Sequence, residues 1–190
     1  MNRDSNQSVA ICVYRCPDIF FGRRTLRVTK STSHKSPAVP ESKPEITVNV
    51  LGVIVRNCAA FGAHGLIVGE TCSTPYLRRS VRNSMGTIFK LPVLEPRSLL
   101  ETLGRLRDGG IRCVAAHGPA RSLPLAQASL AGDCCIVLGS EGYGLSEGVL
   151  AACDQQVSIP MANSVDSLNV GNAAAVFLYE ANRQRGTMGG

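Results

Sequence analysis

Apolar and polar positions alternate in blocks from residue 46 to near the C-terminus. Short apolar runs bounded by glycine, proline or polar residues are typical of buried strands. Longer stretches with an apolar residue every three or four positions are typical of helices. We predict strands at 65–68, 87–93, 111–115, 134–138 and 156–159, and helices at 51–61, 76–84, 98–107, 145–152 and 169–183. Strands that alternate with helices indicate an α/β fold in which helices flank a parallel sheet.

The first 45 residues lack this alternation. Val9–Tyr14 predicts one short strand, and residues 30–44 are rich in Ser, Pro and Lys, which is typical of a linker. We therefore predict a basic, largely disordered N-terminal extension and linker over 1–45. A folded domain would follow over 46–185, with a flexible tail over 186–190.

Composition and charge restrict the class of protein. The chain is 44% hydrophobic and 18% charged, and no apolar run reaches the roughly 18 residues that a membrane span needs. The first residues are polar and lack the apolar stretch of a secretory signal, so we predict a cytoplasmic protein. Residues 1–48 hold eight Lys and Arg against four Asp and Glu, which is +4 of the net charge of +6. Such a segment fits either a polyanion such as RNA or a solvated tail.

Eight cysteines and three histidines raise the question of a metal site or disulfides. No Cys-x-x-Cys pair and no other metal-ligand spacing occurs, so we predict no metal. Cys58, Cys113, Cys134 and Cys135 lie inside apolar segments, where a free cysteine packs as a small hydrophobic residue.

Three glycine-bearing segments lie where predicted strands end or predicted helices begin. The first is Gly52–Arg56, closed by Phe61-Gly62. The second is Leu138–Ser146, and the third runs from Ile159 to Val170. Because ligands of open α/β sheets bind at the carboxyl ends of the strands, we expect these segments to form one composite site.

Each polar residue of these segments also has a purely structural explanation. Glu141 can be a helix N-terminal acid, and Ser167 or Asn169 can cap the last helix. Arg56 can extend from an apolar helix into solvent. The glycine turn at Leu138–Gly142 is not a phosphate-binding loop, because no Gly-Lys-Ser/Thr follows, and it is not a dinucleotide fingerprint.

Taken together, the three segments resemble the three motifs of the SpoU (TrmH-like) family of RNA ribose methyltransferases. They read Gly-x-x-x-Arg with Phe-Gly following, Leu-Gly-x-Glu-Gly-x-Gly-Leu-Ser, and Ile-Pro-Met-x-x-x-x-x-Ser-Leu-Asn-Val, in this order. The resemblance covers about residues 46–185. It implies the SPOUT fold with a deep C-terminal trefoil knot, a homodimer, S-adenosylmethionine as cofactor, and methylation of a ribose 2′-oxygen in tRNA or rRNA.

The resemblance also implies roles for particular residues. The functional polar set would be Arg56, Glu141, Ser167 and Asn169. S-adenosylmethionine would be held at Leu138, Gly139, Ile159, Met161 and Leu168. We further expect Arg56 and the outward-facing Arg78, Arg79 and Arg82 to bind RNA. Dimerisation is expected through the first and last helices, where Gly52, Ala59 and Ala173–Ala175 permit close helix approach.

The chain departs from the family pattern in its first motif. Val50 stands where the family has asparagine, six residues before the arginine, and Asn163 stands where the third motif often has glycine. The altered first motif, Val50 together with the segment 40–50, keeps open an RNA-binding relative with the same knot and little or no turnover. A third hypothesis is an unrelated α/β nucleotide-binding enzyme, but the sequence contains no phosphate-binding motif that would support it. Which RNA and which nucleotide is modified stays open.

Overall fold

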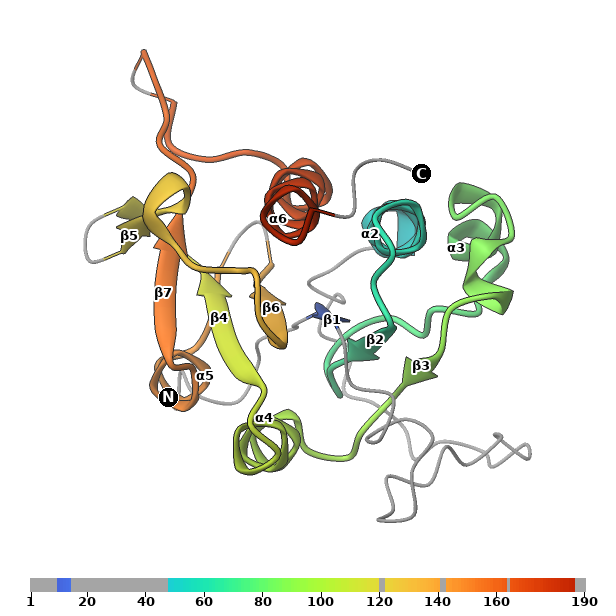
Figure 1. Cartoon of the computed structure of the whole chain (residues 1–190). Coiled ribbons are helices and arrows are strands. Elements are labelled where there is room, and N and C mark those ends of the chain that lie inside the picture. The colour runs from blue at the N-terminus through green and yellow to red at the C-terminus, as the bar shows by residue number, and fades with distance from the viewer. Residues whose placement is uncertain (1–9, 15–47, 120–121, 141–142, 164, 187–190) are drawn as a thin grey trace.

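The computed structural model describes residues 10–14, 48–119, 122–140, 143–163 and 165–186. Within them lies a sheet with the strand order β3-β2-β1-β6-β4-β7-β5 (Figure 1). In chain order the strands are β1 (Ala10–Tyr14), β2 (Gly65–Val68), β3 (Val93–Leu94), β4 (Arg112–Ala116), β5 (Leu123–Pro124), β6 (Cys134–Leu138) and β7 (Gln155–Ser158). Neighbouring strands run parallel, except that β1 is antiparallel to β2 and β6. The α/β fold is confirmed, and the predicted parallel sheet holds apart from β1.

Helices cover both faces of the sheet. They are α2 (Val48–Ala60), α3 (Arg78–Asn83), α4 (Leu99–Asp108), α5 (Glu147–Ala152) and α6 (Val170–Gln184), with short 3-10 helices η2 (Thr87–Phe89) and η4 (Leu125–Gln127). In Figure 1, α2 and α6 lie side by side on one face with α3 next to α2, whereas α4 and α5 lie on the other. Among the described residues, no helix has the length and apolar character that crossing a membrane requires.

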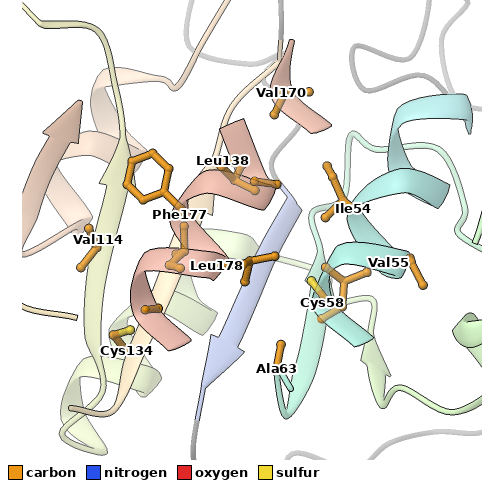
Figure 2. Close-up of a cluster of buried hydrophobic side chains, with 14 of the residues drawn as sticks. Ile54, Val55, Cys58, Ala63, Val114, Cys134, Leu138, Val170, Phe177 and Leu178 are labelled. Atoms are coloured by element: carbon orange, nitrogen blue, oxygen red, sulfur yellow. The ribbon is translucent and has the colours of Figure 1, made fainter. Parts of the chain in front are cut away.

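The sheet separates two hydrophobic cores, because successive side chains of a strand point to opposite faces. On β6, Ile136 belongs to the core under α2 and α6, and its neighbours Cys135 and Val137 belong to the core over α4 and α5. Figure 2 shows the first core, in which Phe177 of α6 and Ile54 of α2 are 1% and 0% exposed. Burying each such side chain stabilises the fold by about 1.5–3 kcal/mol.

Helix α2 is held between α3 and α6 by close backbone contacts. A Cβ atom on Gly52 would lie 2.6 Å from the backbone oxygen of Ser80 on α3. On the other side, a Cβ atom on Gly171 of α6 would lie 3.1 Å from Cγ1 of Val53. The Asn57 side chain donates a hydrogen bond of 2.9 Å to the Gly171 carbonyl. Gly52 therefore packs against α3 of its own chain and not, as predicted, against a second subunit.

Strand β1 is the clearest difference from the predicted domain organisation. The strand predicted at Val9–Tyr14 is confirmed, but it pairs with β2 and β6 in the middle of the sheet. The sheet therefore extends beyond the predicted domain boundary at residue 46. The rest of the predicted extension, 1–9 and 15–47, and residues 187–190 of the predicted tail lie outside the described residues.

The strand predicted at 87–93 is wrong. Thr87–Phe89 forms a 3-10 helix, and only Val93–Leu94 is a strand. Ile88 and Leu91 are the buried side chains of this stretch, three residues apart. A spacing of three suits a 3-10 turn, since a strand would bury every second residue. The trefoil knot implied by the resemblance stays a prediction.

Candidate active site

A pocket lies at the carboxyl ends of three neighbouring parallel strands, β6, β4 and β7. Leu138, Ala116 and Ser158 are the last residues of these strands, and each lines the pocket. This is the edge at which open α/β sheets bind their ligands. The pocket thus brings together the second and third of the three predicted segments, whereas no residue of the first, Gly52–Arg56, lines it.

Six of the residues predicted for the site meet in this pocket. They are Leu138 and Gly139 from the second motif and Ile159, Met161, Ser167 and Leu168 from the third. Leu138 is buried, whereas Ser167 and Leu168 are exposed at the approach to α6. The structure brings them together, and their roles in cofactor binding and catalysis stay predictions.

The second motif forms a tight glycine turn after β6. The Ser140 backbone N–H donates to the Gly144 carbonyl at 3.2 Å, and the Gly144 N–H donates back to the Ser140 carbonyl at 3.0 Å. A Cβ atom on Gly139 would overlap the carbonyl group of Gly144 and lie 2.8 Å from the Leu145 nitrogen. Gly144 has a φ of 69°, in the left-handed region that favours glycine. Glu141, the acid of this turn, lies outside the described residues.

Asn169 has a structural role at the start of α6. It is the N-cap residue, and its side-chain oxygen accepts a hydrogen bond of 2.9 Å from the Gly171 N–H. Asn169 is exposed and does not itself line the pocket, although the preceding Ser167 and Leu168 do. A capping side chain of this kind stabilises the helix end, by about 1 kcal/mol. Its predicted catalytic role therefore comes in addition to capping.

Sequence reasoning missed part of the pocket wall. The end of β4 and the loop after it contribute Ala116, His117, Gly118 and Pro119, and α6 contributes Val170, Ala173 and Phe177. The other lining residues that were not predicted are Ser140, Gly144, Ser158 and Asp166. The His-Gly-Pro step directly follows β4 and begins two residues after the strand predicted at 111–115, so it lies at a strand end like the other two loops. It was missed because no family motif drew attention to it.

Arg56 does not enter this pocket in its own chain. Arg56 follows Gly52 by four residues on α2, and residues so spaced share one face of a helix. Gly52 contacts α3, whereas Val53 and Asn57 face α6. Arg56 therefore lies on the side of α2 that faces α3 and η2, away from α6. There it lines a separate hollow together with Ala59, Ala60, Ala63, Thr87, Lys90 and Leu91.

The three arginines of α3 point into solvent, as predicted. Arg78, Arg79 and Arg82 are all exposed, while Ser80 of the same helix is buried. They lie on the face of the molecule that also carries α2. Their binding of RNA stays a prediction.

The two departures from the family pattern have clear local settings. Val50 is half-buried against the core under α2. Its neighbour Asn49 accepts a hydrogen bond of 3.2 Å at its carbonyl from the Asn83 side chain of α3. Asn163 has a φ of 57°, a left-handed conformation that glycine favours and asparagine tolerates. Asparagine therefore replaces the glycine of the third motif with little backbone strain.

The cysteines contribute to packing. Cys58, Cys113, Cys134 and Cys135 are buried, as predicted, and neither they nor Cys72 and Cys153 take part in a disulfide. Burial raises the pKa of Cys135 well above its usual value, and burial with neighbouring groups raises that of Cys153 to about 12. Such thiols stay protonated and are poor nucleophiles. Within the described part of the chain, no cluster of three or more His, Cys, Asp or Glu is suited to a metal ion.

Comparison with known proteins identifies the class of protein. The SpoU rRNA methylase family matches residues 42–179, most of the chain. A 23S rRNA (uridine(2479)-2′-O)-methyltransferase from Streptomyces viridochromogenes is 38% identical over 144 residues, which cover 71% of this chain and 48% of that protein. A protein of Mycobacterium sp. (strain KMS), named as an uncharacterized tRNA/rRNA methyltransferase, is 41% identical over 135 residues. The chain belongs to the SpoU family.

Solved structures give the same result. The SpoU methyltransferase AviRb from Streptomyces viridochromogenes, crystallised with the cofactor AdoMet, is 36% identical with a TM-score of 0.66, over 74% of this chain and 57% of that one. An AdoMet-bound rRNA methyltransferase from Sinorhizobium meliloti is 29% identical with a TM-score of 0.66, over 72% of this chain and 52% of that one. The matched region spans 43% of the length of the Mycobacterium relative.

Proposed function

We propose that this protein transfers a methyl group from S-adenosylmethionine to a ribose 2′-oxygen of tRNA or rRNA. The observation that carries the proposal is the pocket at the ends of β6, β4 and β7, which gathers the second and third motifs of the SpoU family. A relative that is 38% identical is named as a 23S rRNA 2′-O-methyltransferase, which supports the ribose as the acceptor.

The pocket suits the cofactor of the family. Leu138, Ile159 and Leu168 give it apolar walls, and the turn at Gly139 exposes backbone groups beside them. Apolar walls with a few fixed polar groups are what an adenine ring requires. When bound, S-adenosylmethionine supplies an electrophilic methyl group. The proposed task of the chain is to align the ribose oxygen with that methyl group and to exclude water, since alignment removes much of the barrier.

Arg56 is proposed to act by electrostatics. A guanidinium stays protonated in proteins, so it cannot serve as the base that takes the 2′-hydroxyl proton. It can bind the phosphate or ribose next to the target and stabilise negative charge that develops on the 2′-oxygen. Glu141, Ser167 and Asn169 complete the polar set, with Ser167 lining the pocket.

The position of Arg56 supports a homodimer with shared sites. Within one chain Arg56 lies on the α3 side of α2 and the pocket lies on the α6 side. Val53, Val176 and Tyr179, which are 38%, 37% and 45% exposed, give α2 and α6 an apolar outer face. We propose that this face meets a second copy, so that Arg56 of one subunit serves the pocket of the other.

The alternative of an RNA-binding relative without turnover rests on Val50. The relatives reported above are named as methyltransferases, and Val50 packs against the core instead of entering the pocket. The third hypothesis, an unrelated nucleotide-binding enzyme, is not supported, because residues 42–179 match the SpoU family. Methylation by the intact chain is therefore the function we propose.

Transfer of tritiated methyl groups to bulk RNA tests this proposal. Glu141→Ala and Asn169→Asp should each lower the transfer rate at least tenfold, a loss of about 1.4 kcal/mol of transition-state stabilisation. Asn169→Asp keeps the helix cap, because aspartate also accepts the Gly171 N–H, so a slower variant reports on chemistry and not on folding. Wild-type rates in both variants would contradict the site assignment.

A further inference from the structure

Two large apolar side chains stand in solvent on the α3–η2 connection. Met85, two residues before the short 3-10 helix η2, is 72% exposed, and Phe89, the last residue of η2, is 71% exposed. Single exposed apolar side chains are ordinary on protein surfaces. Two of this size within five residues, next to Lys90, which is also exposed, call for a partner.

The backbone holds this surface in one conformation. Met85 has a φ of 53°, which is unfavourable for a side chain other than glycine, asparagine or aspartate, and Gly86 follows with a φ of 77°. The Thr87 hydroxyl donates to the Ser84 carbonyl at 2.6 Å, and the Phe89 N–H donates to the Gly86 carbonyl at 3.2 Å. Ile88 is 2% exposed and anchors the turn in the core. Phe89 is therefore presented on a fixed support.

The surroundings of Phe89 carry positive charge. Arg56 and Lys90 line the same hollow, together with Thr87 of η2 and three alanines. Residues 46–94 contain five Arg and Lys (Arg56, Arg78, Arg79, Arg82, Lys90) and a single acid, Glu70. Glu70 is engaged elsewhere, since its carboxylate accepts the Leu99 N–H at the start of α4. Positive charge thus lies next to Phe89 in the chain, at Lys90, and at Arg56 in the hollow that Lys90 shares.

We propose that Phe89 and Lys90 hold the nucleotide next to Arg56 when RNA is bound. An unpaired base stacks on the Phe89 ring with Met85 beside it, and Lys90 binds the adjacent phosphate. Exposed aromatic rings in basic grooves bind single-stranded RNA in this manner, because every base offers a stacking face. The base so held fixes the ribose that Arg56 faces. This inference rests on the proposed function, and it adds a positioning residue that no motif of the family pattern contains.

Charge favours RNA over a second copy of the chain as the occupant. Interfaces between subunits are depleted of charge at their centre and enriched in contiguous apolar surface. Here the two exposed apolar side chains lie next to Lys90 in the chain, and they are not part of the apolar outer face of α2 and α6 formed by Val53, Val176 and Tyr179. A phosphate backbone with an unstacked base complements this mixture.

Binding of two probes by the full chain tests the inference without any methyl transfer. The probes are a single-stranded oligouridine of about 12 nucleotides, within the site size of such surfaces, and an abasic ribose-phosphate oligomer of the same length. Phe89→Ala should weaken oligouridine binding roughly fivefold to a hundredfold and leave binding of the abasic oligomer unchanged, and Phe89→Trp should restore it. Lys90→Gln should weaken both probes and lower the salt dependence of binding by about one unit.

Matched controls lie elsewhere on the molecule. Leu100 of α4 is 48% exposed on the opposite face of the sheet, and Arg97 is an exposed cation at the start of that helix. Leu100→Ala and Arg97→Gln should bind both probes like the wild type. The inference is overturned if Phe89→Ala weakens both probes equally or neither. It is also overturned if that variant sediments as a monomer while the wild type is a dimer, because Phe89 is then a subunit contact.

The assay separates this inference from the proposed function. Unchanged probe binding by Phe89→Ala, with methyl transfer by the wild type intact, overturns only the role of Phe89. If the wild type binds oligouridine through Phe89 but methylates no RNA, the role of Phe89 in binding is supported and the proposed methyl transfer is contradicted.

Discussion

Beside the pocket, the backbone of Gly139 passes so close to Gly144 that no side chain fits between them. The two reciprocal hydrogen bonds between Ser140 and Gly144 hold the turn in this shape. A turn of this kind places backbone groups, not side chains, against a ligand. The glycine is thus required by local geometry before any function is considered.

We predict that Gly139→Ala removes S-adenosylmethionine binding and lowers the free energy of unfolding by about 1–3 kcal/mol, because its methyl group overlaps the Gly144 carbonyl. Calorimetric titration with the cofactor and chemical denaturation measure the two effects. Gly148→Ala is the matched control, since a Cβ atom there would lie 3.9 Å from its nearest neighbours, Cδ1 of Leu100 and Oγ of Ser146. Wild-type cofactor affinity in Gly139→Ala would contradict the assignment of the pocket.

Six pocket residues could be predicted from the sequence, but the part of the wall that β4 contributes and the position of Arg56 could not. Leu138 and Ile159 end two of the predicted apolar strands, the family motifs place both at the cofactor, and both line the pocket. His117 was missed, although it follows the strand between theirs in the sheet. Arg56 was expected at the same site, yet it lies on the far side of α2. Strand order and helix rotation depend on contacts between distant residues, and a local pattern does not contain them.

At the scale of the elements, the long periodic segments were predictable. Helices α4 and α6 begin and end within a residue or two of the predicted bounds. The failures fall on short segments. The stretch 87–93 has strand-like composition, but the buried pair Ile88 and Leu91 has the spacing of a 3-10 turn. Strand β1 is predicted by its local sequence. Its place between β2 and β6 is not, because it depends on pairing with residues far away in the sequence.

Helix α6 is fastened at its end by one glutamine. The Gln184 side chain accepts a hydrogen bond of 2.6 Å from the Leu130 N–H and donates 2.8 Å to the Ala128 carbonyl. It also donates to Glu180, at 2.7 Å. Arg183 and Gln184 lower the pKa of Glu180 to about 2, so this carboxylate stays charged at all working pH values. The loop before β6 is thereby tied to the helix that forms one wall of the pocket.

We predict that Gln184→Ala lowers the free energy of unfolding by about 1–3 kcal/mol, because two half-buried backbone groups lose their partner. Urea denaturation measures the change. Gln127→Ala, at an exposed position of η4, serves as the control and should stay within about 0.5 kcal/mol of the wild type. Equal stabilities of the two variants would show that the Gln184 side chain does not fasten α6.

For the whole molecule, the separation of Arg56 from the pocket bears on how the proposed methyl transfer would be organised. One chain holds both parts on opposite sides of α2. A dimer that joins its subunits across the outer face of α2 and α6 would contain two identical sites, each with residues from both chains. Neither subunit would then be active alone.

Subunit mixing tests this arrangement. Two variants are used. Arg56→Ala removes the arginine, and Leu168→Arg places a large side chain in the pocket that Leu168 lines. Each variant should be inactive as a pure dimer. When the two variants are co-expressed in equal amounts, half of the dimers contain one subunit of each kind. One of the two sites in each mixed dimer is intact, so about a quarter of wild-type activity should return. No recovery in the mixture, with mixed dimers shown to form, would place Arg56 and its pocket in the same chain. A fully active monomer in sedimentation would contradict the dimer.

The central claim is that the methyl group goes to a ribose 2′-oxygen. Methylation there removes the hydroxyl that attacks the neighbouring phosphate in alkali, so the adjacent linkage resists cleavage. RNA labelled by the protein with tritiated S-adenosylmethionine is therefore hydrolysed in alkali and separated by size, with Arg56→Ala as the control protein. We predict that the tritium remains in dinucleotides and that Arg56→Ala labels little RNA. Tritium in mononucleotides would place the methyl group on a base, and would contradict the account.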